Sequence, residues 1–168
     1  MRVLTSALLS VALLLPFSAT AEPLAQPGDT PVLTVSGDFS NQNSDNAAIF
    51  DMEMLQALAQ TSFTTTTIWT DGPQEFTGVK VDDLLRDLGI SAGSVKVTAI
   101  NDYAVEIPVA ELLGSEALLA YLRNGEAMSI RDKGPLWLVY PYDADDKFRN
   151  EVIYSRSVWQ VDRIILSE

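Results

Sequence analysis

The sequence feature that most constrains the fold is the apolar run at residues 136–140, which stands between Gly134-Pro135 and Pro141. An apolar run of this length between turn-forming residues is typical of a buried strand. Alternating or β-branched residues predict further strands at residues 32–37, 63–69, 95–100, 103–107 and 158–166. The chain is therefore expected to fold mainly from strands.

Short helices are expected between these strands. Apolar residues at helical spacing predict a helix over residues 49–59, and residues 81–89 form a second helix that ends at Gly89. Many strands with a few short helices indicate the α+β class. The other segments are interpreted as a helical turn at 108–113, a helix or buried segment at 117–123, an extended stretch at 128–131 and a charged loop at 144–150.

The first 21 residues are expected to be a cleaved secretory signal peptide. A positive charge precedes the apolar residues 3–15, and Ala19-Thr20-Ala21 has the pattern of a cleavage site. An apolar run of that length is too short to span a bilayer. Residues 22–31 are interpreted as a linker and residues 32–168 as a single domain. The mature protein is therefore expected in the periplasm.

The composition excludes several classes of enzyme. The 168-residue chain contains no cysteine and no histidine. It therefore lacks a catalytic thiol and the thiolate ligands of iron–sulfur clusters. It also lacks the commonest general base and the usual ligand of zinc and haem. The formal net charge of −12 argues against nucleic acid or anionic lipid as a partner.

Planar side chains that form hydrogen bonds gather in the last quarter of the chain. Arg131-Asp132 precedes the apolar run that contains Trp137, and Arg156-Ser157-Val158-Trp159 follows it. Such side chains suit a flat heteroaromatic ligand, because aromatic rings stack and guanidinium and carboxylate groups form paired hydrogen bonds. Together with residues beside other turns, they give the candidate ligand-binding set Trp69, Asn101, Tyr103, Arg131, Asp132, Arg156 and Trp159.

Several motifs, in their order along the chain, resemble the sulfite-oxidase-type molybdopterin-binding fold. They are Phe76-Thr77-Gly78-Val79 before a Leu-Leu helix, Asn101-Asp102-Tyr103, Asn124-Gly125, and Gly134-Pro135-Leu136 at the start of the strand that ends at Pro141. The resemblance covers about residues 61–167 and implies a mixed, β-rich core with short helices. Catalytic members of the family hold molybdenum through a cysteine, which this chain lacks, and Trp137 stands where they have an arginine.

Residues 131–135 and 156–160 more closely resemble a small, cysteine-less periplasmic subfamily of this fold. Some of its members bind reduced pterins and report them to an inner-membrane protein that makes or degrades cyclic-di-GMP. The resemblance implies a ligand-binding protein that is not an enzyme, with a pterin as its ligand and no catalytic cofactor. Its partner would be the periplasmic domain of a membrane-anchored cyclic-di-GMP cyclase or phosphodiesterase.

Each polar candidate has two interpretations. Asp132 suits the N–H groups of a pterin's amino-pyrimidinone edge, but an aspartate at this place also pins the following turn. Arg131 and Arg156 suit a ring carbonyl or a ring face, or else they form surface ion pairs. Asn101 both donates and accepts, and it is also a common turn residue.

The tryptophans either stack on a ligand or belong to the core. Trp137, inside the apolar run, is expected in the core, whereas Trp69, beside Asp71-Gly72, is the best placed to contact a ligand. The acidic pair Asp82-Asp83 is interpreted as a helix start, and the cluster at residues 143–146 lacks the spacing of a calcium loop.

Two other hypotheses remain open at this point. One is a molybdopterin-dependent oxidoreductase, or an accessory subunit of one, whose cofactor is held without a cysteine. The other is a structural interaction domain without a small ligand. Molybdenum in the purified protein would favour the first of these, and a pterin fluorescence signal would argue against the second.

Overall fold

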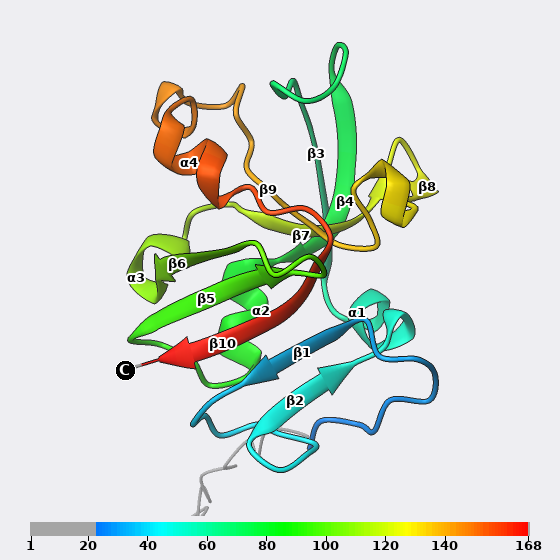
Figure 1. Ribbon diagram of the computed structural model, residues 1–168, viewed down its shortest axis with the longest axis vertical. Helices are drawn as coiled ribbons and strands as arrows, with labels where there is room; N and C mark the ends of the chain where they lie inside the picture. The colour runs from blue at the N-terminus through cyan, green and yellow to red at the C-terminus, as the bar shows by residue number, and fades with distance from the viewer. Residues whose placement is uncertain (1–22, 168) are drawn as a thin grey trace, which may run out of the picture.

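The structure is a computed structural model that describes residues 23–167 (Figure 1). The signal peptide expected at residues 1–21 lies outside the described residues. Two five-stranded sheets and several short helices make up the fold, which confirms the expected α+β class. Within residues 23–167, no helix is long and apolar enough to cross a bilayer.

The first sheet carries the N- and C-terminal strands of the described chain. Its strands, in spatial order, are β2 (Ala47–Phe50), β1 (Leu33–Ser36), β10 (Val161–Ser167), β5 (Ser94–Ala99) and β6 (Ala104–Pro108). β1 runs parallel to β10, and the other neighbours are antiparallel. This sheet therefore joins the two ends of the domain in one layer.

The second sheet contains the remaining strands. They are β3 (Gln60–Thr65), β4 (Gln74–Lys80), β7 (Leu118–Arg123) and β8 (Glu126–Ala127), with β9 (Trp137–Val139) also paired to β7. β4 is irregular at Thr77 and Gly78. A Cβ at Gly78 would lie 2.2 Å from the carbonyl oxygen of Leu119, so the close approach of β4 to β7 requires a glycine there.

The segment that leads into β10 connects the two sheets. Leu138 in β9 donates its N–H to Val158 O at 2.8 Å, and Val161 donates to Leu136 O at 3.0 Å. Trp137 and Trp159 form an isolated antiparallel bridge between these contacts. The two tryptophans are therefore held side by side where the sheets meet.

Helices fill the space around the sheets (Figure 1). They are α1 (Met52–Ala57), α2 (Val81–Asp87), α3 (Val109–Leu112), α4 (Glu151–Arg156) and the 3₁₀ helices η1 (Ile130–Asp132) and η2 (Asp146–Phe148). α2 buries Leu84 and Leu85 in the main aliphatic core. Asp82 and Asp83 lie in its first turn, as expected from the helix dipole.

Several expected elements differ from the observed ones. Residues 49–59 contain the end of β2 and then α1, because residues 47–50 pair with β1 and Asp51 caps the helix by accepting from Met54 N. Residues 117–123, expected to be a helix or a buried segment, are mostly buried and contain the strand β7. β7 lies between β4 and β9, so its buried residues fall on both faces and show no alternation.

Three further segments also differ from the expected elements. The strand expected at residues 63–69 ends at Thr65, so residues 66–73 form a loop that carries Trp69. The segment expected to be extended at 128–131 turns into η1. The charged loop at 144–150 contains η2, and the following helix α4 has no counterpart among the expected elements.

Candidate functional site

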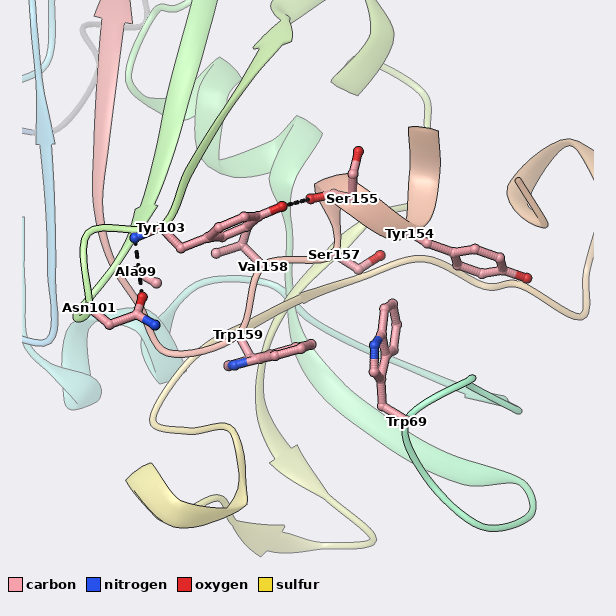
Figure 2. Close-up of a pocket in the computed structure, with 9 residues that line it drawn as sticks. All are labelled: Trp69, Ala99, Asn101, Tyr103, Tyr154, Ser155, Ser157, Val158 and Trp159. Atoms are coloured by element: carbon pink, nitrogen blue, oxygen red, sulfur yellow. Dashed lines mark hydrogen bonds between the residues drawn. The ribbon is translucent and has the colours of Figure 1, made fainter. Parts of the chain in front are cut away.

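A cavity of about 350 Å³ lies beside the place where the two sheets meet (Figure 2). Its size is within the range of small-ligand pockets. Three segments build it: the β3–β4 loop, the β5–β6 turn, and the stretch from α4 to β10. The lining residues are Trp69, Ala99, Asn101, Tyr103, Tyr154, Ser155, Ser157, Val158 and Trp159.

Aromatic rings form the walls of the cavity. The ring centroids of Trp69 and Trp159 are 5.7 Å apart with an interplanar angle of 74°. Trp69 and Tyr154 meet at 5.9 Å and 88°. These edge-to-face pairs are a favourable arrangement of aromatic rings. Because the two indoles are steeply inclined to each other, a flat ligand can stack on only one of them while the other closes its edge.

The β5–β6 turn supplies the polar rim. Asn101 Oδ1 accepts the N–H of Tyr103 at 3.1 Å, and Asp102 between them takes a positive φ of 66°. The Tyr103 hydroxyl donates to Ser155 O in α4 at 3.0 Å, as Figure 2 shows. Tyr103 remains 49% exposed. It therefore links two walls of the cavity while part of its ring stays open to solvent.

A buried polar group supports the cavity floor. The Tyr142 hydroxyl donates to Ser157 Oγ at 2.6 Å, and this oxygen donates to Ile153 O at 2.8 Å. Trp137 Nε1 donates to Ser157 O at 3.3 Å. Burial raises the pKa of Tyr142 to about 12. Ser157 is thus positioned by three hydrogen bonds and lies behind the tryptophans.

Several donors in the cavity have no partner in the part of the chain that the structure describes. They are Asn101 Nδ2 and the indole N–H groups of Trp69 and Trp159, which form no hydrogen bond within residues 23–167. No carboxylate and no basic side chain belongs to the lining. The cavity therefore presents aromatic faces and neutral donors, a combination that suits an uncharged heterocycle with carbonyl or ring-nitrogen acceptors.

Four of the seven candidate residues meet in this cavity. Trp69, Asn101, Tyr103 and Trp159 come from three separate segments and line the same space. The expectation that Trp137 belongs to the core is confirmed, because its ring is fully buried. Sequence reasoning missed Ala99 in β5 and four residues on or after the unexpected helix α4, which are Tyr154, Ser155, Ser157 and Val158.

Arg131 and Asp132 lie outside the cavity lining. Both are exposed in η1, and the Asp132 carboxylate accepts from Ser129 Oγ at 2.8 Å. Gly134 N and Asp132 N both donate to Ser129 O, at 2.8 and 2.9 Å. A Cβ at Gly134 would lie 1.8 Å from Met128 O. The structure thus gives Asp132 the turn-pinning role that the sequence left as the alternative.

Arg156 also points away from the cavity. Its guanidinium forms an ion pair with Glu111 in α3 at 2.6 Å, and its side chain is 13% exposed. The hydrogen bond from Arg156 holds the pKa of Glu111 below its usual value. Arg156 therefore fastens α4 to α3, and through α4 it supports the wall that contains Tyr154.

Lys133 is the member of the charged triplet that approaches the aromatic cluster. Its ammonium lies 5.4 Å from the centroid of the Trp159 ring and 5.7 Å from that of Trp137. Cations at such distances are attracted by the electron-rich face of an indole. In the sequence, Lys133 stands directly before Gly134-Pro135, which could have marked it as a candidate. Its position alone does not distinguish it from Arg131 and Asp132.

A family model described as Oxidoreductase molybdopterin binding domain matches residues 33–144 of the chain. Among solved structures, the chain is similar to the crystal structure of the sulfane dehydrogenase SoxCD from Paracoccus pantotrophus, with a TM-score of 0.58 and 18% sequence identity. The match covers 80% of this chain and 37% of that one, so this chain spans well under half of the length of that protein. A comparison with curated proteins found no match.

Proposed function

Because the chain belongs to the oxidoreductase molybdopterin-binding domain family, we propose that it binds a pterin-type ring in the cavity lined by Trp69 and Trp159 and acts as a ligand-binding protein rather than as an enzyme. The observation that carries the proposal is the composition of the cavity. Aromatic walls, neutral donors and the absence of ionised side chains from the lining suit the flat ring system of a pterin.

The residues present do not fit the complete metal-bearing cofactor of the family. The chain has no cysteine to anchor molybdenum. Within residues 23–167, no three His, Cys, Asp or Glu side chains gather into a group that could hold a metal ion. The cavity lining also offers no Arg or Lys to a phosphate group. The site therefore suits the pterin ring but not the metal or the phosphate.

The ring itself matches the donors of the cavity. A pterin carries a carbonyl oxygen and ring nitrogens that accept hydrogen bonds, and Asn101 Nδ2 and the indole N–H groups can supply them. Asn101 Oδ1 and Ser155 O already accept one hydrogen bond each, and each oxygen can accept a second from the ring's amino group. Stacking of a flat heterocycle on an aromatic side chain contributes about 1–3 kcal/mol.

The proposal also includes a cellular location and a protein partner. The leader pattern at residues 1–21 supports export to the periplasm. The resemblance of residues 131–135 and 156–160 to the pterin-binding subfamily supports a membrane-anchored cyclic-di-GMP cyclase or phosphodiesterase as partner. A ligand can control such a partner only if the loaded and empty forms bind it with different affinity.

The family membership also favours a second candidate function. A molybdopterin-dependent oxidoreductase, or an accessory subunit of one, is consistent with the matched family and with the fold shared with the sulfane dehydrogenase. This alternative requires a cofactor that is held without a cysteine ligand. It predicts molybdenum in the purified protein, whereas the first proposal predicts none.

One preparation tests both candidates. The protein, produced in a host that makes molybdenum cofactor, is assayed for metal and then titrated with 7,8-dihydrobiopterin and with oxidised biopterin. We expect no molybdenum and saturable binding of a pterin. Trp159→Ala should weaken binding about tenfold or more, from the loss of stacking. Stoichiometric molybdenum without pterin binding would favour the oxidoreductase instead.

Two variants serve as controls for the tryptophan. Trp159→Phe keeps an aromatic face and should retain part of the affinity. Ile165→Ala removes an exposed apolar side chain from β10, outside the cavity lining, and should bind like the wild type. Equal binding by Trp159→Ala and wild type would place the ligand elsewhere on the molecule.

A further inference from the structure

The loop that presents Trp69 has open space on more than one side. The cavity lies on one side of the indole, and a second hollow of about 220 Å³ lies between Thr66, Ile68, Tyr142 and Arg149. Ile68, next to Trp69, is 63% exposed. Within residues 66–73, Trp69 alone packs against the buried clusters. Apolar packing of the loop therefore depends on one side chain.

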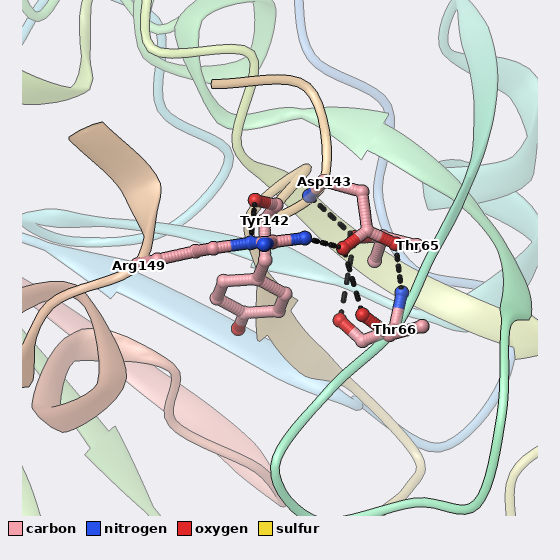
Figure 3. A network of polar contacts seen from close by, with 5 residues as sticks. All are labelled: Thr65, Thr66, Tyr142, Asp143 and Arg149. Carbon is pink, nitrogen blue, oxygen red and sulfur yellow. Dashed lines mark hydrogen bonds and ion pairs between the residues drawn. The ribbon is translucent and has the colours of Figure 1, made fainter. Parts of the chain in front are cut away.

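Polar contacts to Asp143 hold the start of this loop (Figure 3). Thr66 donates its backbone N–H to Asp143 Oδ2 at 2.6 Å and its hydroxyl to Asp143 Oδ1 at 2.7 Å. Asp143 N donates in return to the hydroxyl of the buried Thr65 at 3.0 Å. One carboxylate thus fixes both the backbone and the side chain of the first loop residue.

Arg149 also binds the Asp143 carboxylate and the residue before it. Its Nε donates to Tyr142 O at 2.8 Å, and its terminal nitrogen forms an ion pair with the Asp143 carboxylate. The Tyr142 ring packs against Trp69 with centroids 6.2 Å apart. The Thr66 hydrogen bonds hold the pKa of Asp143 below its usual value, so the carboxylate is ionised at neutral pH. The segment after β9 is therefore bound to the loop by charge and by packing.

A short path leads from Thr66 to Trp69. Trp69 N donates to Thr67 Oγ1 at 3.0 Å, and this oxygen also meets Thr70 Oγ1 at 2.8 Å. The far end of the loop is held separately, because Gln74 Nε2 donates to Asp71 O at 2.8 Å. Within the described chain, Asp143 is the carboxylate that ties the loop to the segment carrying η2.

We propose that Asp143 is the positioning residue of the ligand site, which sets the place of Trp69 through its hydrogen bonds to Thr66. This role rests on the proposed function, since it concerns the affinity of the same cavity. Asp143 is not among the residues that line the cavity, so it acts through the loop. A protein that contacts residues 143–150 and displaces Arg149 would therefore alter the cavity wall, which gives the ligand and the partner a shared structural element.

Substitutions at Thr66 test the role without changing charge. Thr66→Val removes the hydroxyl at nearly constant volume, whereas Thr66→Ser keeps it. Thr64→Val is the matched control, because the Thr64 hydroxyl in β3 makes no hydrogen bond within residues 23–167. Each variant is compared by urea unfolding, by amide hydrogen exchange of residues 66–73 without ligand, and by titration with 7,8-dihydrobiopterin.

We expect faster exchange in residues 66–73 of Thr66→Val and a dissociation constant raised about three- to tenfold, the effect of one lost hydrogen bond. Thr66→Ser and Thr64→Val should match the wild type. Asp143→Asn should resemble Thr66→Val, because it weakens both the loop contacts and the pair with Arg149. A purely structural role would lower stability without selective exchange in this loop or weaker binding.

The outcomes separate the two proposals. If the wild type binds the pterin but Thr66→Val binds equally well, the positioning role of Asp143 is overturned and the proposed function stands. If exchange in residues 66–73 is unchanged in Thr66→Val, the role is overturned as well. If the wild type binds no pterin, the proposed function fails and this role fails with it, while the exchange data still report whether Asp143 holds the loop.

Discussion

The two ends of the domain are packed in different ways. Under the first sheet, aliphatic residues from β1, β5, β10 and α2 close on one another, and the side chains of Val35, Leu85 and Val95 are fully buried. At the other end, the cluster around Trp137 is aromatic and opens into the 350 Å³ cavity beside Trp69 and Trp159. The aliphatic side chains are closed in on all sides, whereas Trp69 and Trp159 pack against each other and also line the cavity.

Because of this difference, the stability of the domain and the binding of a ligand should depend on different residues. The fully buried residues of this aliphatic core, such as Val35, Leu85 and Val95, contribute through packing, and none of them lines the 350 Å³ cavity. The residues that line the cavity at the open end, such as the half-exposed Tyr103, also offer ring faces and donors to a ligand. Substitutions at the two ends should therefore affect different measurements.

The largest effect is expected in the aliphatic core under the first sheet. Leu85→Ala removes a fully buried side chain from α2 and should lower the free energy of unfolding by about 2–5 kcal/mol. Urea unfolding followed by fluorescence measures the loss. Folded Leu85→Ala should still bind 7,8-dihydrobiopterin like the wild type. Weakened binding by the folded fraction would mean that the two ends are coupled.

A smaller effect is expected in the polar floor of the open end. Tyr142→Phe deletes the hydroxyl that donates to Ser157 Oγ and should lower the free energy of unfolding by about 0.5–1.5 kcal/mol. Ser157 keeps its bond to Ile153 O, so no buried donor loses its only partner. Tyr121→Phe, which loses a hydrogen bond from Gln60, provides a comparison in the second sheet. A loss above about 3 kcal/mol would indicate a wider rearrangement of the floor.

Much of this architecture could be predicted from the sequence. Short apolar runs between turn residues identified β1, β5, β6, β9 and β10 to within a few residues, because local alternation and turn chemistry specify such strands. β7 was ambiguous because it is buried on both faces. Helix α4 was missed because it has six residues, none of them buried, and so carries no apolar stripe.

The candidate site was predictable only in part. Trp69, Asn101, Tyr103 and Trp159 stand beside turns, where pocket rims form, and the structure brings them together. Arg131, Asp132 and Arg156 are as polar and as close in sequence, but local geometry directs them to Ser129, to Glu111 or to solvent. Side-chain direction depends on tertiary contacts, which residue type and spacing do not encode.

A still smaller effect is expected at the rim of the cavity. Tyr103→Phe removes the partly exposed hydrogen bond to Ser155 O, which should change the free energy of unfolding by about 0.5 kcal/mol or less. The dissociation constant for 7,8-dihydrobiopterin should rise less than in Trp159→Ala, because the ring of residue 103 remains. Tyr103→Ala, which removes the ring, should weaken binding more than Tyr103→Phe. Equal binding by both variants would exclude the Tyr103 ring from the ligand contact.

The smallest effect is expected from pH between 5 and 8. The chain has no histidine, the side chain that ordinarily titrates in this range. The pKa of Asp51 is lowered by the hydrogen bond from Met54 N and by those from residues 28 and 29, and hydrogen bonds from Thr66 lower that of Asp143. Both carboxylates therefore remain ionised across this range, one at each end of the domain.

Stability should fall at both acid and alkaline pH, because the carboxylates have lowered pKa values and the buried tyrosines have raised ones. A carboxylate with a lowered pKa stabilises the fold above its unfolded value near 3.8, and this contribution is lost as pH falls through the lower folded value. Burial raises the pKa of Tyr140, and it raises that of Tyr142 to about 12, so stability should fall as pH rises above about 10. Urea midpoints measured from pH 3 to 11 should form a plateau between these limits. Tyr142→Phe should reduce the alkaline slope but not the acid one, and Asp51→Asn should do the reverse. A slope inside the plateau would require a titrating group that neither end of the domain supplies.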